Sequence, residues 1–475
     1  MFEPSKGAAD ALEEGKFVGY PLIAATLGLS AIIALAPFPF GSMDSRVIAV
    51  WVVLLSAVLL LASLQAVSAR DLAFLFGFAA VGLAWILVVS EQLARTPIFS
   101  QQLVAPIWKI ASSILGEELD GSVSIARNQP YFSAGSQIAC TLSMVCGFLV
   151  GRNRRAAASL LMSFAVSALA YSAYGILAFV FWPNYLLWHQ KYNYLNSLTA
   201  TFVNPNVAAT YFGAAALAWT LMLSNVVKGN SAGATRRWSE LVSSFFRNPS
   251  RRTVWYFTAC FIIFAATFLT GSRAGTVLSL LMVTGAVGTF YRRELRTRRL
   301  LLVFPIAAAF ATLAALLIFA PRVNQRFGAE GFFDVGRWNA YTSSIDIIGD
   351  YPWLGSGLGT FRWVFPAYRS GDIPSYGIWE QAHNTTLEIA SEMGIPFTIL
   401  LGAAWLAIFL ILGRGMLRRR RDAIFPISAF WIGLLAILHS QVDFPLQIPG
   451  LSLAICPLIG MGLAQSVSSK REVLT

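Results

Sequence analysis

Long apolar stretches separated by short polar segments dominate this sequence. About twelve stretches of roughly 17–25 residues are each long enough to cross the hydrocarbon core of a bilayer as an α-helix. They lie near residues 18–36, 47–68, 72–92, 134–151, 156–182, 204–227, 253–270, 274–291, 300–320, 395–413, 424–442 and 449–466. Residues 1–16 are polar and mixed in charge and lack the basic region and cleavage site of a secretory signal, so we expect the first stretch to remain in the membrane.

The composition agrees with this pattern. Of the 475 residues, 56% are hydrophobic and only 12% are charged, whereas about a quarter of a soluble protein is charged. The sequence therefore predicts an all-α polytopic membrane protein with about 12 transmembrane helices. The expected regions are an N-terminal tail at 1–17, a membrane domain of about nine helices at 18–320, a large polar loop with short helices at 321–395, a membrane domain of about three helices at 396–466 and a C-terminal tail at 467–475.

Arginine-rich connections alternate with connections that carry few arginines. The basic connections contain Arg152, Arg154 and Arg155; Arg236, Arg237, Arg247, Arg251 and Arg252; Arg292, Arg293, Arg296, Arg298 and Arg299; and Arg414 and Arg418 through Arg421. The positive-inside rule places all of them in the cytoplasm, together with both termini. The net charge of +12 is then a topology signal, and we expect no nucleic-acid partner.

The opposite face receives loops near residues 93–133, 183–203, 271–274, 321–395 and 443–448. The second of these carries the aromatic residues Tyr185, Trp188, Tyr192 and Tyr194. Aromatic residues gather at membrane interfaces, and they also stack on the apolar faces of sugar rings. The sequence favours the interfacial role and leaves the sugar-stacking role open.

Cysteine and histidine do not form a metal-binding pattern. Cys140, Cys146, Cys260 and Cys456 all fall inside apolar stretches, where small buried hydrophobic side chains are expected. No pair of acidic residues with metal-ligand spacing is visible either. We therefore predict no metal site and no cofactor.

Several unusual polar residues are predicted to reach the outer face. Asn204 and Asn206 begin the sixth span, where they are expected either to cap the helix or to bind substrate. Arg273 lies in a hairpin that is too short to be a solvated loop. It is expected either to cap a helix or extend to the membrane surface, or to bind an anion. Arg337 begins a predicted helix in the large loop, and the glycine-rich run 349–361 that follows is expected to form a tight turn.

His383 is one of only three histidines and lies near the end of the polar loop. A helical spacing of nine residues would place Glu392 near the same helix face, about two and a half turns below. With two outer-face arginines nearby, His383 is a candidate catalytic group, whereas His189 and His439 are expected to be structural. Asp443 follows the eleventh span, and its expected role is to orient a catalytic group, to bind sugar hydroxyls or to cap a helix.

Two arginines and one histidine suggest a particular reaction. The arginines would hold a pyrophosphate leaving group, and the histidine would take the proton from an attacking hydroxyl. A transporter for the same lipid-linked substrates would require charges deep in several spans, and here the polar groups gather at one face. The pattern favours an enzyme.

The motifs from about residue 200 to residue 450 resemble those of the O-antigen ligase and O-antigen polymerase superfamily of bacterial envelope glycosyltransferases. The matching elements are Phe202-x-Asn-x-Asn206, Ser272-Arg-Ala-Gly275, Arg337-Trp338, the turn from Pro352 to Phe361, and His383-Asn384 through Gly394. The last element keeps the ligase spacing but has Phe397 where the ligases have Gly, Thr or Tyr. An Arg-x10-Gly repeat found in some polymerases is missing from the outer loops, which favours a ligase.

The resemblance implies a metal-independent, inverting enzyme of about twelve spans in the bacterial inner membrane, with its active site facing the periplasm. Its donor would be a glycan on undecaprenyl pyrophosphate. The acceptor would be lipid A–core for a ligase, or a second lipid-linked glycan for the alternative, a polymerase. By this resemblance Arg273 and Arg337 match the pyrophosphate-binding arginines and His383 the proposed base, and the expected substrate-binding residues are Asn204, Asn206, Asn384, Glu392 and Asp443.

Overall fold

The computed structural model describes residues 6–65, 67–97, 101–229, 250–293, 335–371, 373, 378–419 and 421–467. The predicted span at 300–320 and residues 321–334 of the large loop lie outside these residues. The elements are α1 (Lys6–Leu35), η1 (Phe40–Ser42), α2 (Ser45–Ser63), α3 (Ala69–Leu93), η2 (Gln101–Leu103), α4 (Ile107–Leu115), α5 (Gln129–Gly151), α6 (Arg154–Phe181), β1 (Tyr185–Leu186), β2 (His189–Gln190), α7 (Pro205–Gly229), α9 (Arg251–Leu269), α10 (Arg273–Phe290), α12 (Val335–Asp350), α13 (Phe361–Tyr368), α14 (Thr385–Met393), α15 (Ile395–Arg418), α16 (Ile424–His439), η3 (Pro445–Gln447) and α17 (Pro449–Val467).

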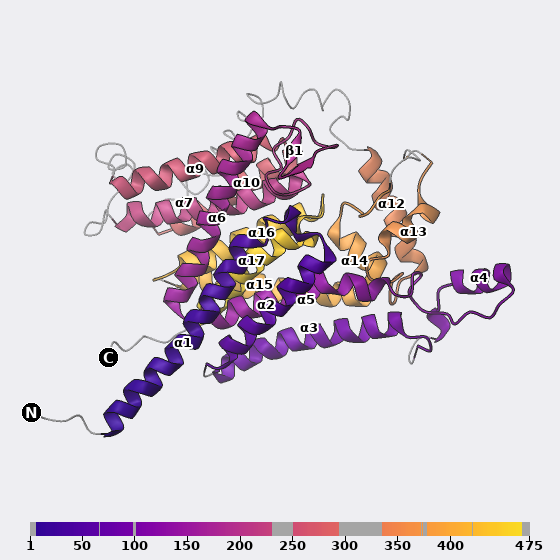
Figure 1. The fold of residues 1–475 in the computed structure, drawn as a ribbon, viewed down its shortest axis with the longest axis horizontal. Helices are drawn as coiled ribbons and strands as arrows, with labels where there is room; N and C mark the ends of the chain where they lie inside the picture. Colours follow the sequence, from indigo (N-terminus) through magenta and orange to yellow (C-terminus); the bar gives the residue numbers. More distant parts are fainter. Residues whose placement is uncertain are drawn as a thin grey trace, which may run out of the picture.

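The described part of the chain is almost entirely helical (Figure 1). Nine of the described helices are long and apolar enough to cross a bilayer, and Gly19–Leu35 and Ile424–His439 are shorter apolar helices. Together they account for every predicted span except the one at 300–320. The prediction of an all-α polytopic membrane protein is confirmed.

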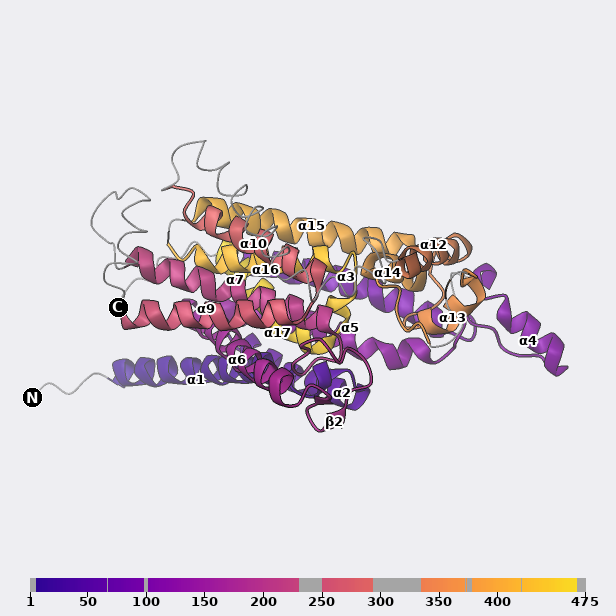
Figure 2. The same cartoon turned by 90° about the horizontal axis from the view of Figure 1, so that it is seen from above.

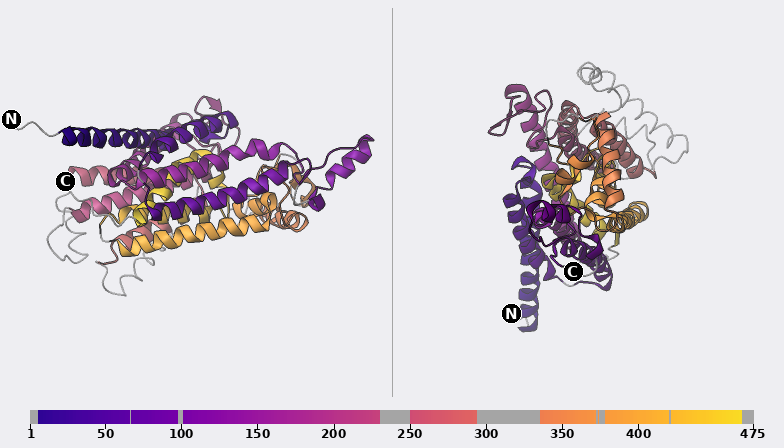
Figure 3. Two further views of the ribbon diagram at one scale, coloured as in Figure 1. Left: turned by 90° about the horizontal axis from the view of Figure 1, so that it is seen from below. Right: turned by 90° about the vertical axis from the view of Figure 1, so that its right-hand side faces the viewer.

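Helices α7 and α17 form the centre of the bundle. In the most apolar window of each, 89% of the residues are buried, against 6% for α3 and 11% for α15. The latter two helices lie side by side on the outside of the bundle (Figure 3, left). Because both are apolar and nevertheless exposed, they present their outer faces to lipid.

Glycines allow α5 and α17 to approach each other closely. A Cβ atom added to Gly147 would lie 2.2 Å from the carbonyl oxygen of Pro457, and one added to Gly460 would lie 2.0 Å from that of Met144. Small residues drive helix association in membranes in this way, because burying apolar surface gains little there. This contact holds the middle of α17 against α5.

The basic connections meet at one end of the bundle. Arg152 pairs with Asp71 at 3.1 Å, and Arg154 pairs with Asp422 at 2.9 Å. These pairs join the beginnings of α3 and α6 to the connection between α15 and α16. The arrangement agrees with the predicted placement of the arginine-rich connections on a common side.

Helices α12, α13 and α14 lie at the other end of the bundle, away from both termini (Figure 2). Their small core contains Ala340, Ile347, Phe361 and Phe365, all at most 1% exposed. Gly394 separates α14 from α15, where φ is +81° and a Cβ atom would lie 2.2 Å from the oxygen of Trp353. The short helices predicted for the polar loop are present, and they cover the end of the bundle where the candidate site residues gather.

Candidate active site

The turn between α16 and α17 carries the central carboxylate of the site. The eleventh span was predicted to run to residue 442, but α16 ends at His439, because the chain turns there and Asp443 N–H bonds back to the His439 oxygen at 3.0 Å. The Asp443 side chain is 0% exposed. A buried charge needs partners, and each of those described below comes from a different part of the chain.

Three side chains surround the Asp443 carboxylate. Arg337 Nη2 lies 3.4 Å from Oδ2, and His383 Nδ1 lies 3.9 Å from Oδ1. Asn206 donates a short hydrogen bond to Oδ2, and the Phe444 N–H donates to Oδ1 at 2.8 Å. Burial by itself would raise the pKa of Asp443, but the neighbouring His383 ring and the Arg337 guanidinium outweigh it and lower the pKa below its ordinary value. The carboxylate is therefore held in its charged form.

His383 does not lie on a helix face with Glu392, and that prediction is wrong. Asn384 is the N-cap of α14, so the helix begins at Thr385 and His383 precedes it with φ +55°. The Tyr341 hydroxyl donates to the His383 carbonyl oxygen at 3.0 Å. This contact holds a backbone conformation that few non-glycine residues adopt, and such residues are frequent at active sites.

A row of aromatic rings fixes the His383 imidazole. Phe361 stacks on Phe365 at 5.1 Å between centroids, and Phe365 stacks on Trp379 at 5.7 Å. The His383 ring then makes edge contacts with Trp379 at 5.5 Å and with Phe444 at 5.0 Å. The ring is thus held between the small core of α12, α13 and α14 and the α16–α17 turn. Its Nδ1 is buried and lies on the side of Asp443.

Arg337 lies near the beginning of α12, and its side chain reaches the α16–α17 turn that carries Asp443. Its Nη1 donates to the Val442 carbonyl oxygen at 2.8 Å, and its side chain keeps 29% of its surface exposed. Tyr341 lies one turn further along α12 and binds the His383 backbone. Helix α12 therefore positions the arginine and the histidine together.

Arg273 is the first residue of α10, after the N-cap Ser272. A cation at a helix N-terminus is unfavourable with the helix dipole, so the position is not explained by helix stability. A Cβ atom on Gly275 would lie 2.5 Å from Ala209 Cβ and 3.0 Å from His439 Cε1. The beginning of α10 thus packs against α7 and the end of α16, at the end of the bundle that holds Asp443.

The two asparagines at the start of α7 have different contacts. Asn204 Oδ1 accepts from the Asn206 N–H at 2.7 Å, which is a capping interaction, and Asn204 also lines a cavity described below. The Asn206 side chain instead binds Asp443. Asn206 is thus the member of the pair that contacts the central carboxylate.

Asn384 holds two backbone segments together. Its Oδ1 accepts from the N–H groups of Thr386 and Leu387 at 3.0 and 3.1 Å, and its Nδ2 donates to the Gln441 oxygen at 2.9 Å. Its observed contacts cap α14 and fasten it to the α16–α17 turn. Substrate binding by Asn384 stays a prediction.

Glu392 is buried beneath the glycine-rich turn. Its two oxygens accept from the N–H groups of Gly359 and Phe361 at 2.8 and 2.9 Å. Gly355 has φ +71°, and a Cβ atom there would lie 2.1 Å from the Glu392 carbonyl carbon, so only glycine fits. The tight turn predicted for 349–361 is confirmed, and the observed contacts of Glu392 hold that turn.

We expect the stability of the protein to fall as the pH rises from about 4.5 to about 7. Burial raises the pKa of Glu392 from 4.5 to about 7, although the backbone N–H groups partly oppose this effect. The folded protein then binds the proton more tightly than the unfolded chain, so the stabilisation is complete below pH 4.5 and is lost by pH 7. Burial and the nearby Glu392 carboxyl also raise the pKa of Glu388, so both carboxyl groups contribute to this fall in stability.

Thermal unfolding in detergent between pH 4.5 and pH 8 measures this effect. Glu392→Gln should flatten the dependence of Tm on pH while lowering Tm at acid pH, since an amide supplies one acceptor oxygen to two N–H groups. The Glu117→Gln variant, which removes an exposed carboxyl group from the loop after α4, serves as the control. An unchanged slope in Glu392→Gln would contradict the assignment.

The other two histidines lie outside this cluster. His439 is 1% exposed, and its Nδ1 lies 2.6 Å from Thr210 Oγ1. His189 is exposed in β2, where its ring contacts Phe40 at 5.1 Å. The contacts of both agree with structural roles. Within the described residues, no group of three or more His, Cys, Asp or Glu side chains is arranged to hold a metal ion.

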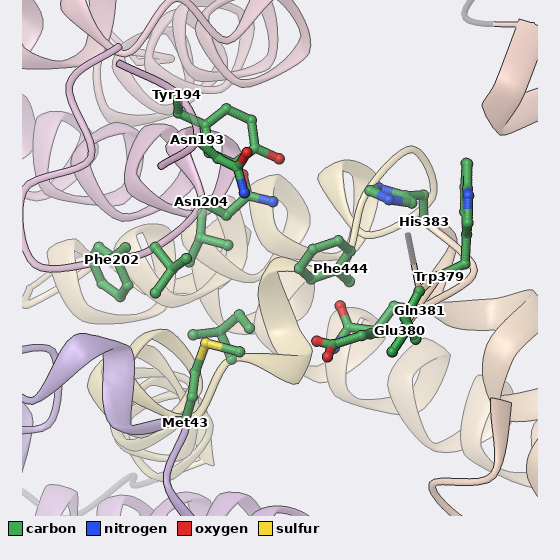
Figure 4. A pocket seen from close by; sticks show the side chains of 14 residues that line it. Met43, Asn193, Tyr194, Phe202, Asn204, Trp379, Glu380, Gln381, His383 and Phe444 are labelled. Atoms are coloured by element: carbon green, nitrogen blue, oxygen red, sulfur yellow. The ribbon is translucent and has the colours of Figure 1, made fainter. Parts of the chain in front are cut away.

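A cavity of about 350 Å³ opens beside His383 (Figure 4). On one side lie Asn193, Tyr194 and Asn204, on the other Trp379 and His383, and Phe444 lies between the two groups. Sequence reasoning missed Trp379 and Phe444, because neither belongs to a spaced motif. The one signal for Trp379 was an aromatic residue four positions before the candidate histidine.

Comparison with known protein families agrees with the motifs. Residues 258–402 match the model of a family described as O-antigen ligase. The matched segment includes Arg273, Arg337 and His383, whereas Asn206 and Asp443 lie outside it. No curated protein matches the chain. The resemblance to the O-antigen ligase and polymerase superfamily is confirmed for this segment.

Proposed function

We propose that this multi-pass membrane protein, whose residues 258–402 match the O-antigen ligase family model, is an inverting glycosyltransferase of the ligase type. It would transfer a glycan from undecaprenyl pyrophosphate to a hydroxyl of lipid A–core, without a metal ion. One observation carries the proposal: Arg337, His383 and Asn206 converge on the buried carboxylate of Asp443 at one end of the bundle.

Each group has a part in a balanced reaction. His383 takes the proton of the acceptor hydroxyl, and the oxygen attacks the anomeric carbon of the donor sugar. The bond from that carbon to the pyrophosphate oxygen breaks, so undecaprenyl pyrophosphate leaves with the bonding electrons and the anomeric configuration inverts. Arg273 and Arg337 stabilise the charge that develops on the leaving group. Asp443 holds the His383 ring and stabilises it once it is protonated.

The arginines are expected to bind the donor diphosphate through charge-assisted hydrogen bonds, each contributing about 1.5–3 kcal/mol. Arg273→Lys and Arg337→Lys should therefore lower transfer by roughly tenfold or more, since lysine keeps the charge but loses the planar fork. Arg155→Lys, an exposed arginine at the opposite end of the bundle, is the matched control. Binding and transfer of purified lipid-linked donor measure the effect, and wild-type affinity together with wild-type turnover in Arg273→Ala would assign that residue to anchoring alone.

The proposed location is the bacterial inner membrane, with both termini in the cytoplasm and the loop domain 321–395 in the periplasm. The two ion pairs of Arg152 and Arg154 support this orientation, because they gather basic connections at the end remote from His383. Single cysteines at Ser370 and Ser63 should be labelled by an impermeant reagent from the periplasm and only after permeabilisation, respectively. Labelling of position 63 in intact cells would refute the orientation.

A polymerase is the alternative, and cellular glycans distinguish the two. Deletion of a ligase should leave lipid A–core without polymer while polymer accumulates on its lipid carrier. Deletion of a polymerase should instead leave single repeat units.

A further inference from the structure

The cavity beside His383 reaches the proposed base without reaching the proposed donor-binding arginines. Its volume of about 350 Å³ lies in the range of small-molecule sites, about 300–1,000 Å³. His383 lines it, whereas neither Arg273 nor Arg337 does. In a transferase with these roles, the space that touches the base but avoids the diphosphate contacts belongs to the acceptor.

The walls of the cavity have the chemistry of a saccharide site. Aromatic side chains lie on both walls, Tyr194 on one and Trp379 on the other (Figure 4). The side-chain amides of Asn193 and Gln381 supply both donors and acceptors for hydroxyl groups. Trp379 is already fixed by its stacking on Phe365 at 5.7 Å, so little freedom is lost when a ring packs against it.

The charge of the lining is what distinguishes among acceptors. Glu380 contributes a carboxylate, and no lysine or arginine is among the described residues that line the cavity. Arg362 lies 3.8 Å from Glu380, but both side chains are partly exposed, at 37% and 63%, so this pair offsets the charge only weakly. A carboxylate accepts hydrogen bonds from sugar hydroxyls and repels phosphate.

We infer that this cavity is the acceptor subsite and that it takes an uncharged sugar ring, packed against the aromatic side chains of the lining and hydrogen-bonded by Asn193, Gln381 and Glu380. The inference rests on the proposed transferase function. The sugar residue that receives the new glycosidic bond would then belong to an unphosphorylated part of the acceptor, and its reacting hydroxyl would lie at His383.

Steady-state kinetics with purified protein test the subsite. Asn193→Ala and Tyr194→Ala should each raise the KM for the acceptor about three- to tenfold and leave the KM for the lipid-linked donor unchanged. Asn196→Ala and Tyr192→Ala are matched controls, because these exposed residues of the same loop do not line the cavity. A rise in the donor KM instead would overturn the acceptor assignment, and no change in either KM would overturn the subsite.

The prediction that the subsite takes an uncharged sugar is tested by comparing two forms of one acceptor. One is lipid A–core, and the other is the same material after its phosphate groups are removed with hydrofluoric acid. The wild-type KM should be equal or lower for the dephosphorylated form. Glu380→Lys should reverse this preference by about tenfold, whereas Glu118→Lys, an exposed carboxylate far along the chain, should not. A wild-type preference for the phosphorylated form that Glu380→Lys leaves unchanged would refute the uncharged subsite.

The proposed transferase function and the acceptor subsite are contradicted by different results. If the wild-type protein transfers no glycan from lipid-linked donor, the proposed function is wrong. If transfer occurs and depends on His383, but the cavity variants behave as their controls, the function stands and the acceptor subsite lies elsewhere.

Discussion

Replacing His383 by alanine is expected to reduce glycan transfer by about 10²–10⁴-fold, the range that a positioned general base contributes. The reason is geometric: the ring is held between Trp379 and Phe444, and its Nδ1 faces a charged carboxylate 3.9 Å away. The aromatic contacts hold the ring in one orientation, and the carboxylate favours the proton on the nearer nitrogen, Nδ1, which leaves the second ring nitrogen to accept a proton. Donor binding should be unaffected, because the donor contacts are assigned to the arginines.

The measurement is single-turnover transfer from purified lipid-linked donor, with donor binding measured separately. His189→Ala is the matched control, since that histidine lies in the exposed β2 strand away from the cluster. A normal melting temperature should accompany the loss, because the alanine removes a partly exposed ring and leaves the Tyr341 contact to the backbone intact. Near-normal turnover by well-folded His383→Ala protein would exclude base catalysis by this residue.

Replacing Asp443 by asparagine is expected to cost nearly as much activity as the loss of the base, at least about 10²-fold. The carboxylate is 0% exposed and faces His383 and Arg337 at once. Asparagine has the same shape but no charge, so it can neither stabilise a protonated imidazole nor hold the guanidinium in place. Breaking a buried charge pair in this way leaves the partner uncompensated.

A double-mutant cycle distinguishes this role from a merely structural one. If Asp443 acts through His383, the activity of the double variant His383→Ala, Asp443→Asn should equal that of the single variants, because groups that act as a unit are not additive. Asp422→Asn, whose carboxylate pairs with Arg154 at the other end of the bundle, is the control. Fully additive losses would show that Asp443 does not act through His383.

Some of the candidate site was accessible from local sequence patterns. The glycine turn was predictable, because positive φ angles and close backbone approach select glycine at fixed positions such as Gly355. The roles of Asn384 and Glu392 were not visible in the same way. Both bind backbone groups of other segments, and a motif does not show whether its polar atoms face substrate or the chain itself.

The relation between His383 and Glu392 shows where periodicity is insufficient. Nine residues at helical spacing would share a face only if the helix began before His383. The side chain of Asn384 instead caps α14, which places His383 outside the helix with φ +55°. Capping is a competition between side chain and backbone for the same N–H groups, and the sequence pattern alone did not decide it.

The sequence by itself determined that this protein is a helical membrane protein and where the spans of the described residues lie. These properties follow from hydropathy and charge summed over short windows, because the insertion of each segment into a bilayer depends mainly on its own composition and flanking charges. Only the tertiary structure decided that Asp443 is the meeting point of the site. Its partner Asn206 lies 237 positions away, and a carboxylate can be buried only where donors from distant helices converge on it, which depends on how the whole bundle packs.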